Sequence, residues 1–134
     1  MIQFRRFEKG MELGDGFFEG WPHPPDKETH EKILENSALA IVAIDDETGQ
    51  VIGFVNAISD GVHAAYIPLL EVLPSYRGRG VGRKLMEKIL HELRDLYMID
   101  LVCNEDLVSF YKDMGMHPLR AMGKRNYEAQ SGKK

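Results

Sequence analysis

The sequence of 134 residues contains a single cysteine, Cys103, and a single tryptophan. One cysteine excludes a disulfide within the chain and leaves no cysteine cluster for a metal. His-Glu-x-x-His and paired Cys/His spacings are also missing, so we expect no metal site. Cys103 lies in an apolar stretch without an evident histidine partner, which favours an inert core thiol over an acyl carrier.

Long hydrophobic runs are missing as well, although hydrophobic residues make up 43% of the chain. The apolar runs are too short for a membrane-spanning helix, and residues 1–6 lack the apolar core of a signal peptide. The net charge of −4 argues against nonspecific nucleic-acid binding and weakly favours a cationic or amine acceptor. We therefore expect a cytoplasmic protein that binds neither nucleic acid nor membrane, with one domain at residues 1–134.

Hydrophobic periodicity predicts an alternation of strands and helices. Strand patterns occur at residues 2–7, 39–45, 50–58, 65–73, 98–104 and 119–127, and helical patterns at about 26–35, 81–96 and 105–115. Asp26 is suited to cap the first helix, and Gly115 to end the last one. The early strands should form an antiparallel meander, and the later strand–helix–strand unit should be parallel and right-handed. These features predict an α/β (α+β) fold with helices on both faces of one sheet.

A glycine-rich turn lies between the apolar strand that ends near residue 73 and the periodic helix that follows. The first amides of a helix have no intrahelical partner, and glycines let a phosphate approach the backbone closely. The order of strand, glycine turn and helix therefore predicts a site for a phosphate-bearing cofactor. We assign to this site the contiguous residues Arg77, Gly78, Arg79, Gly80, Val81, Gly82 and Arg83.

The spacing of the glycines decides between cofactors. A dinucleotide fingerprint that starts at Gly78 fails, because its sixth position is Arg83, and no Gly-Lys-Ser/Thr of a P-loop is present. The spacing Arg77-x-x-Gly80-x-Gly82 does fit, and it resembles the R/Q-x-x-G-x-G/A motif of the GNAT superfamily of acyl-CoA-dependent acetyltransferases.

Two further segments carry the same resemblance. Residues 70–76 resemble the family's hydrophobic strand and proline before the arginine, and Asn104 and Tyr111 match the family's positions at a strand end and on a short helix. The resemblance implies acetyl-CoA as co-substrate. It also implies a mixed, mostly antiparallel sheet whose splayed parallel strand pair opens a cleft for the pantetheine arm. Pro68 marks either that splay or an ordinary strand start or bulge.

The resemblance also implies contacts to the cofactor outside the glycine turn. The strand residues Leu70, Val72 and Leu73 would bind the pantetheine arm, and backbone amides at the splay would polarise the acetyl carbonyl. Asn104 would contact the arm as well. Its alternative role, which is compatible with the first, is to cap the helix that follows.

Acid–base roles complete the predicted site. The resemblance implies that Tyr111 is the general acid for the CoA thiolate, although a tyrosine on a short helix is often only a core aromatic. Glu71 is the candidate base, because a carboxylate between apolar neighbours has a raised pKa and can draw a proton through a water. A surface or ion-paired glutamate is the alternative. Asp60, His63 and Asp100 are weaker candidates.

The predicted function is N-acetyl transfer from acetyl-CoA to a primary amine of a small molecule or peptide, by direct attack. Phe17, Phe18, Trp21 and His23 either line the acceptor pocket or fill the core under an irregular loop. The alternative function is a non-catalytic acyl-CoA sensor or interaction module. A homodimer is compatible with the sequence, but no segment indicates the interface.

Overall fold

The structure is a computed structural model that describes residues 1–133. Its centre is a six-stranded sheet in the order β1-β3-β4-β5-β6, with β2 paired to the start of β4. The strands are β1 (Ile2–Arg6), β2 (Glu12–Leu13), β3 (Leu39–Asp45), β4 (Gln50–Ser59), β5 (Ala64–Val72) and β6 (Met98–Leu101). The helices are α1 (Lys27–Glu35), α2 (Val81–Glu92) and α3 (Val108–Lys112), with 3-10 turns at Pro74–Tyr76, Glu105–Leu107 and Tyr127–Ala129.

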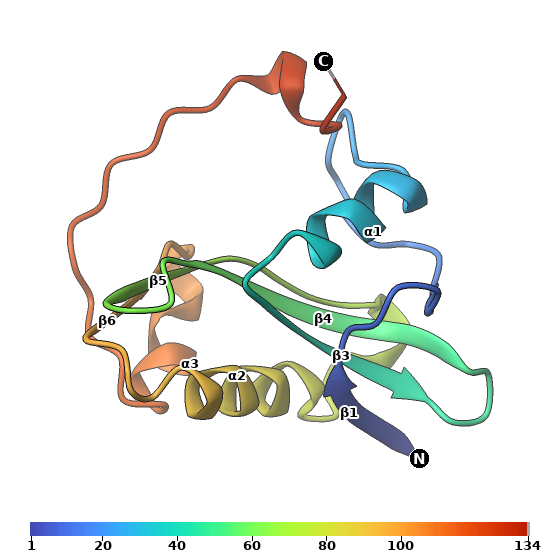
Figure 1. The fold of residues 1–134 in the computed structure, drawn as a ribbon, viewed down its shortest axis with the longest axis horizontal. Helices are drawn as coiled ribbons and strands as arrows, with labels where there is room; N and C mark the ends of the chain where they lie inside the picture. Colours follow the sequence, from blue (N-terminus) through green and yellow to red (C-terminus); the bar gives the residue numbers. More distant parts are fainter. Residues whose placement is uncertain (134) are drawn as a thin grey trace.

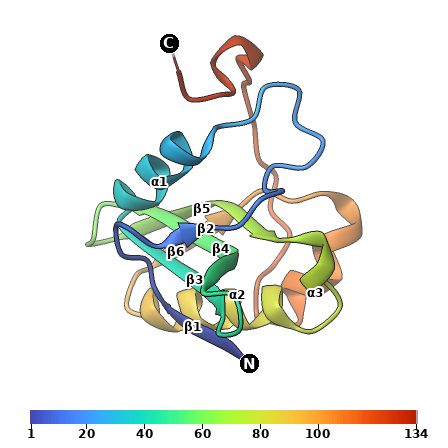
Figure 2. The ribbon, with the colours of Figure 1, turned by 90° about the vertical axis from the view of Figure 1, so that its right-hand side faces the viewer.

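The strand pairing confirms the predicted fold class. Strands β1, β3, β4 and β5 pair antiparallel in succession, whereas β5 and β6 are parallel. Helix α1 covers one face of the sheet, and α2 and α3 cover the other (Figure 1; Figure 2 shows the same layers from the side). Within residues 1–133, no helix combines the length and the apolar composition needed to cross a bilayer.

Alternation along the central strands divides the core between the two faces. In β3, Ile41 and Ala43 belong to the cluster under α2, and Ala40 and Val42 belong to the cluster under α1. The apolar stripe of α2 buries Leu85, Met86 and Ile89 completely against the sheet. Each such side chain contributes about 1.5–3 kcal/mol relative to an exposed one, so the apolar stripe fastens α2 to the sheet.

The parallel pair β5–β6 parts in the middle of β5. Pairing runs from Ala64 opposite Met98 to Ile67 opposite Leu101, and β5 then continues alone on that side for five more residues. The parting begins at Pro68, where the register of β5 against β4 also shifts. Both interpretations of Pro68 therefore hold, because a residue without an amide proton marks a bulge and the start of the splay.

Several predicted elements end earlier than the sequence indicated. The helix predicted at about 105–115 is divided into the 3-10 turn Glu105–Leu107 and α3, which ends at Lys112. Helix α2 ends at Glu92 and not at residue 96, because Leu93 leaves the helical conformation while its side chain stays buried. The helical spacing of apolar residues thus continues past the end of α2 into the turn that begins at Leu93. Strand β6 ends at Leu101 and not at residue 104, since β5 has moved away at that point.

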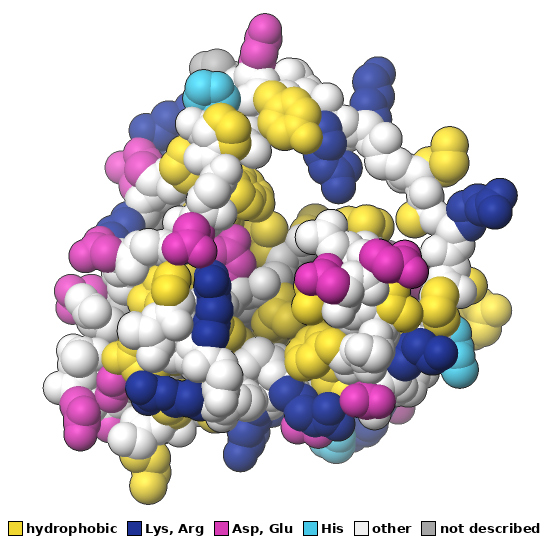
Figure 3. Space-filling model, turned by 180° about the vertical axis from the view of Figure 1, so that it is seen from behind, with side chains coloured by type: hydrophobic (Ala, Val, Ile, Leu, Met, Phe, Trp, Pro, Cys, Tyr) yellow, Lys and Arg dark blue, Asp and Glu magenta, His cyan; other side chains and the backbone are white. Residues whose placement is uncertain are grey.

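The predicted strand at residues 119–127 is wrong for the single chain. Residues 117–126, which we call the C-terminal strap, contain no regular structure and are exposed throughout. The strap leaves the sheet after α3 and arches over to α1 (Figure 1), and it frames an opening with hydrophobic side chains along its margin (Figure 3). Its far end is held by Gln130, which accepts a bond of 2.8 Å from the amide of His23, and by Lys133, 2.6 Å from Asp26.

Candidate functional site

The glycine turn has the geometry of an anion site. Gly78 and Gly80 have φ angles of 77° and 78°, a left-handed conformation that favours glycine, and Gly80 is the N-cap of α2. Within the described chain, the backbone amides of residues 78–83 have no hydrogen-bond partner, and the first bond at the helix start runs from Lys84 to Gly80. These amides are therefore available to a bound phosphate.

A small residue under the turn brings α2 close to the sheet. A Cβ atom at Gly53 of β4 would lie 3.2 Å from Leu85 and 3.4 Å from Val81. Gly82 faces the end of β5, since its Cβ would lie 3.7 Å from Val72. The first turn of α2 thus rests directly against the splay. Gly53 could not be identified from the sequence, because an isolated glycine in a strand gives no signal about what packs on it.

The three arginines of the predicted site have different environments. Arg77 donates from Nε to the carbonyl oxygen of Val72 at 3.0 Å and from Nη1 to Glu19 at 3.3 Å. The guanidinium of Arg79 lies over the ring of Tyr76, 5.3 Å from its centre. Arg83 pairs loosely with Glu87, one helical turn away, at 3.6 Å.

The partners of these arginines position the turn. Tyr76, in the 3-10 turn before the glycines, donates to the carboxylate of Asp45 at the end of β3. Arg77 connects the turn to the end of β5 and to the loop that carries Glu19. Glu19, Asp45 and Tyr76 were all missed by the sequence analysis, because their partners are distant in the chain.

The open edge of β5 supplies backbone groups beside the turn. Leu73 donates to the carbonyl of Ile52 at 2.8 Å across β4, and its own carbonyl accepts from Tyr76 at 2.9 Å. Because antiparallel pairs alternate along a strand, the backbone groups of Val72 and Leu70 point the other way, toward the side that β6 has left. Leu70 and the amide of Val72 thus offer polar groups to a ligand in the splay, whereas the carbonyl of Val72 is bound by Arg77 and both backbone groups of Leu73 are bound within the protein.

Glu71 is half-buried on the face of the sheet that α1 covers. Its Oε1 accepts a hydrogen bond of 2.7 Å from the amide of Phe18. Burial raises the pKa of the Glu71 carboxyl, and the bond from Phe18 and the charge of Arg77 oppose this shift. The position therefore combines a raised pKa, as expected for a base, with a structural bond to the loop of Phe18.

The aromatic residues of the first third lie mainly in the core. Phe17 and Phe54 meet edge to face with ring centres 5.2 Å apart, and Phe18 is 3% exposed. His30 of α1, which the sequence analysis missed, is buried among these rings, 4.5 Å from Phe54. The core interpretation therefore holds for Phe17 and Phe18, while Trp21 packs on Phe18 at the edge of the cluster with ring centres 4.9 Å apart.

Tyr111 of α3 lies on the opposite face, in the core under α2. Its ring packs edge to face on Phe110 with centres 4.9 Å apart. Burial raises the pKa of the phenol, and the neighbouring Cys103 adds to this shift. No hydrogen bond among residues 1–133 engages its hydroxyl, and that oxygen is not among the fully buried unpartnered atoms. The hydroxyl therefore reaches the surface while the ring stays buried.

Asn104 is available to a ligand, whereas the weaker candidates Asp60, His63 and Asp100 lie away from the site. Asn104 precedes the turn before α3, and its exposed side chain makes no capping bond, which leaves its amide available. Asp60 accepts bonds from three amides of the β4–β5 turn, and these lower its pKa to about 2. Asp60 and His63 lie at the opposite end of β5 from Glu71, and Asp100 pairs with Tyr66 there. These three residues therefore do not join the site.

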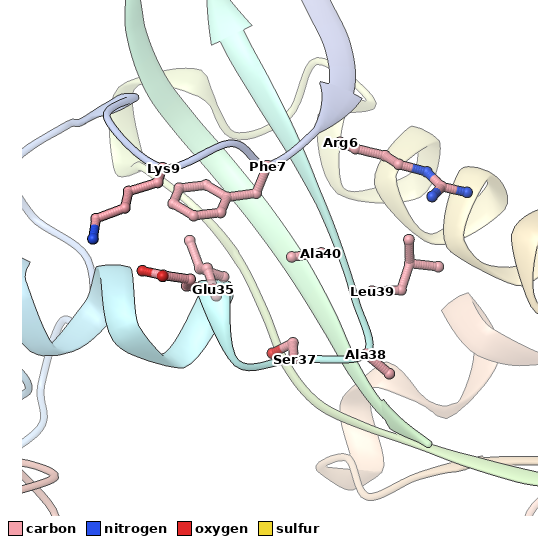
Figure 4. Close-up of a pocket in the computed structure, with 9 residues that line it drawn as sticks. Arg6, Phe7, Lys9, Glu35, Ser37, Ala38, Leu39 and Ala40 are labelled. Carbon is pink, nitrogen blue, oxygen red and sulfur yellow. The ribbon is translucent and has the colours of Figure 1, made fainter. Parts of the chain in front are cut away.

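Pockets elsewhere in the fold are separate from this site. Figure 4 shows one of about 230 Å³ between the end of β1 and the end of α1. A second of about 460 Å³ lies between β1 and α2. Neither is lined by the glycine turn, Glu71 or Tyr111. Over residues 1–133, no group of three or more His, Cys, Asp or Glu side chains is arranged to hold a metal ion.

Comparisons with known sequences agree with this geometry. The family described as Acetyltransferase (GNAT) family matches residues 10–116. An uncharacterized N-acetyltransferase, ycf52, of Pyropia yezoensis is 34% identical over 101 residues, which cover 72% of this chain and 57% of that protein. The chain thus spans little more than half the length of such curated relatives.

Solved structures are similar over a larger share of the chain. A protein of Deinococcus radiodurans R1 assigned as an acetyltransferase is 49% identical, with a TM-score of 0.93 over 99% of this chain and 94% of that chain. A GNAT family acetyltransferase of Streptococcus pneumoniae TIGR4 is 26% identical, with a TM-score of 0.72 over 94% and 98% of the two chains. From the family match and these likenesses, the chain belongs to the GNAT family of acetyltransferases.

Proposed function

We propose that the protein transfers an acetyl group from acetyl-CoA to a primary amine, which attacks the thioester directly. The observation that carries this proposal is the adjacency of two sets of free backbone groups. The amides of residues 78–83 have no protein partner, and Leu70 and the amide of Val72 offer the open edge of β5 beside them. A diphosphate followed by an amide-bearing arm matches that arrangement.

Binding would use main-chain groups more than side chains. The amides of Val81, Gly82 and Arg83 at the start of α2 would hold the diphosphate, with support from the helix dipole. Arg79 and Arg83 would add positive charge. Arg77 would act mainly through the shape of the turn, because Val72 and Glu19 already occupy its guanidinium.

Proton transfer to the leaving group is assigned to Tyr111. Acetyl-CoA supplies an activated acetyl group and a thiolate leaving group. The raised pKa keeps the phenol protonated at neutral pH, so its hydroxyl can donate a proton to the sulfur as the carbon–sulfur bond breaks. Asn104, which precedes α3 and has a free side-chain amide, would contact the same arm.

Proton removal from the amine is assigned to Glu71 or to a water that it orders. The raised pKa makes the carboxylate a better base than an exposed glutamate. Oε1 is held by the amide of Phe18, which leaves the second oxygen for the proton. The acceptor, a small molecule or a peptide amine, would approach from the α1 side of the sheet. We place the reaction in the cytoplasm.

One observation favours a second function, a non-catalytic acyl-CoA sensor. Glu71 has a structural bond to Phe18, and Phe18 has a positive φ of 64°, unusual for a bulky residue. If holding this conformation is the only role of Glu71, the protein has a site for acetyl-CoA but no base to activate an acceptor amine. Such a protein would bind acetyl-CoA without turnover.

A thiol-release assay separates the two functions. Acetyl-CoA is offered with a panel of small amines, polyamines, amino acids and peptide N-termini, and the free CoA thiol is measured. Release that depends on one class of amine supports the enzyme and identifies the acceptor. Calorimetric binding of acetyl-CoA without release for any acceptor would support the sensor.

A further inference from the structure

The outer edge of β1 is open. This strand is the first in the order of the sheet, and among the described strands it pairs only with β3. Two bonds show which of its backbone groups point toward β3, because the carbonyl of Met1 and the amide of Phe7 both bond on that side, at 3.0 Å and 2.9 Å. Backbone groups of an antiparallel strand alternate in direction, so those of Phe4 and Arg6 face away from the sheet.

A groove of about 460 Å³ lies between this strand and α2. Two contacts across it show that β1 and α2 run in the same direction. The Nζ atom of Lys84 lies 5.5 Å from the centre of the Phe4 ring, and Arg6 contacts Glu92, further along α2, at 3.0 Å. Figures 1 and 2 both show the two elements side by side. The ring of Phe4 and the side chain of Ile41 supply apolar lining.

The side chains that line the groove carry more positive than negative charge, although the whole chain has a net charge of −4. The acids of the groove, Glu87 and Glu92, are each paired with an arginine, at 3.6 Å and 3.0 Å. The exposed Lys84 and Lys88 have no carboxylate within ion-pair distance among residues 1–133. These two amines are therefore available to the negative charges of a partner.

The spacing of the two lysines matches the period of an extended strand. Lys84 and Lys88 are one turn apart on α2, which separates them by about 6 Å along the helix axis. Side chains on one face of a strand recur at every second residue, about 6.6 Å apart. A strand added to the β1 edge would present alternate side chains to the groove, and acids at two such positions would meet both lysines.

The same charges disfavour a second copy of this chain as the occupant. Pairing of two β1 edges would bring Arg5 and Arg6 of both copies together beside the lysines of both grooves. Like charges across an interface repel, and positively charged side chains on an edge strand prevent such self-pairing. An acidic strand meets attraction where a second copy meets repulsion.

We propose that the β1 edge and the groove beside it bind an extended acidic peptide of another protein, with acids at alternate positions. The peptide backbone would pair with the outward groups of Phe4 and Arg6 and extend the sheet by one strand. Its acids would face Lys84 and Lys88. Because β1 and the splay between β5 and β6 lie at different edges of the sheet, the partner would leave the acetyl-CoA site open.

Two synthetic peptides test whether the surface recognises alternation. The probe is Thr-Val-Glu-Val-Glu-Val-Thr, and the control, Thr-Val-Val-Glu-Glu-Val-Thr, has the same composition but adjacent acids, which point to opposite faces of a strand. Both carry the same neutral fluorophore and an amidated C-terminus. Fluorescence anisotropy with the full chain should show saturable binding of the probe and at least about fivefold weaker binding of the control. No saturable binding, or equal affinity for both peptides, would overturn the proposal.

Reversing the charge of the two lysines tests their role. Lys84→Glu with Lys88→Glu should weaken binding of the probe at least about tenfold, because two attractions become repulsions. The matched control, Lys112→Glu with Lys124→Glu, changes the net charge equally at exposed positions outside the groove and should bind like the wild type. Equal affinity in the two double variants, with both folded by circular dichroism, would contradict the role of the groove.

Hydrogen exchange of the wild type tests the backbone pairing. Saturation with the probe should slow exchange of the outward amides of Phe4 and Arg6, whereas exchange at Gln3 and Arg5, whose amides face β3, should not change. Binding of the probe without added protection at Phe4 and Arg6 would refute strand addition. These measurements contain no acetyl-CoA, so their outcome is independent of the proposed catalytic activity.

Discussion

The carboxylate of Glu71 and the backbone amide of Phe18, 53 positions apart in the chain, are joined by a hydrogen bond of 2.7 Å. Phe18 holds a positive φ there, and its ring is buried in the aromatic cluster under α1. The bond connects the loop of the first third to the strand that borders the splay. A substitution at Glu71 can therefore change catalysis, stability or both, and suitable variants separate these effects.

We predict that Glu71→Gln lowers kcat by about 10²–10⁴, as expected for loss of a general base, and leaves the melting temperature nearly unchanged. Glutamine retains an oxygen that can accept from Phe18 but cannot take a proton. Glu71→Ala should lose activity and also about 1–3 kcal/mol of stability, because the half-buried amide is left without a partner. Full activity in Glu71→Gln would exclude this residue as the base.

The raised pKa of Glu71 predicts the shape of the pH profile. Activity should rise with pH through an apparent pKa above the ordinary value of 4.5 for this carboxyl, and Glu71→Gln should remove that limb. Whereas activity rises with pH, the contribution of this carboxyl to the free energy of unfolding falls with pH. The folded state holds the proton more tightly than the unfolded state, so this group disfavours folding increasingly as pH rises from the unfolded pKa to the folded one. Denaturant titrations of both proteins across this range measure the difference.

Tyr111→Phe should lower kcat by about 10²–10⁴ with little change in stability. The ring stays packed on Phe110, and the hydroxyl that is removed has no partner among the described residues. Steady-state kinetics with the best acceptor from the panel gives the comparison. Tyr127→Phe, in the exposed 3-10 turn near the C-terminus, serves as a matched control that should retain wild-type rates. Unchanged kcat in Tyr111→Phe would assign the proton to another donor.

The burial of His30 should make the protein less stable in mild acid. Burial lowers the pKa of its imidazole from 6.5 to about 4, and its Nε2 atom has no hydrogen-bond partner in the described part of the chain. The free energy of unfolding is highest above the pKa that His30 has in the unfolded state. It decreases by up to about 3 kcal/mol as pH falls toward the pKa of His30 in the folded state. His30→Phe should reduce this dependence in urea titrations, whereas His23→Phe, in an exposed loop, should retain it. Equal acid sensitivity in both variants would refute this role.

The sequence predicted the elements that carry strong periodicity and the motif with the most specific spacing. The stripe of α2 and the glycine turn before it were foreseen, because helix periodicity and glycine spacing are local properties, whereas the left-handed conformation of Gly78 and Gly80 was not predicted. The end of α2 was placed too late because Leu93 is buried from a turn as well as it would be from a helix. Hydrophobic spacing reports burial and does not distinguish the two conformations.

Contacts between distant segments were not predictable. The bonds of Arg77 to Glu19 and of Glu71 to Phe18 depend on how the first loop folds over β5, and no local pattern encodes them. The strand predicted at residues 119–127 failed for a related reason. Strand formation requires a neighbouring strand to pair with, and the chain's own fold directs residues 117–126 away from the sheet toward α1 (Figure 1).

Calorimetric titration of acetyl-CoA into the purified protein tests the central claim most directly. The wild type should bind with a measurable heat, and Gly80→Glu should abolish binding, because its side chain and charge enter the space in front of the free amides. Gly61→Glu, at a left-handed position of similar φ in the distant β4–β5 turn, should bind like the wild type. No heat with the wild type, or equal affinity in Gly80→Glu, would contradict the account.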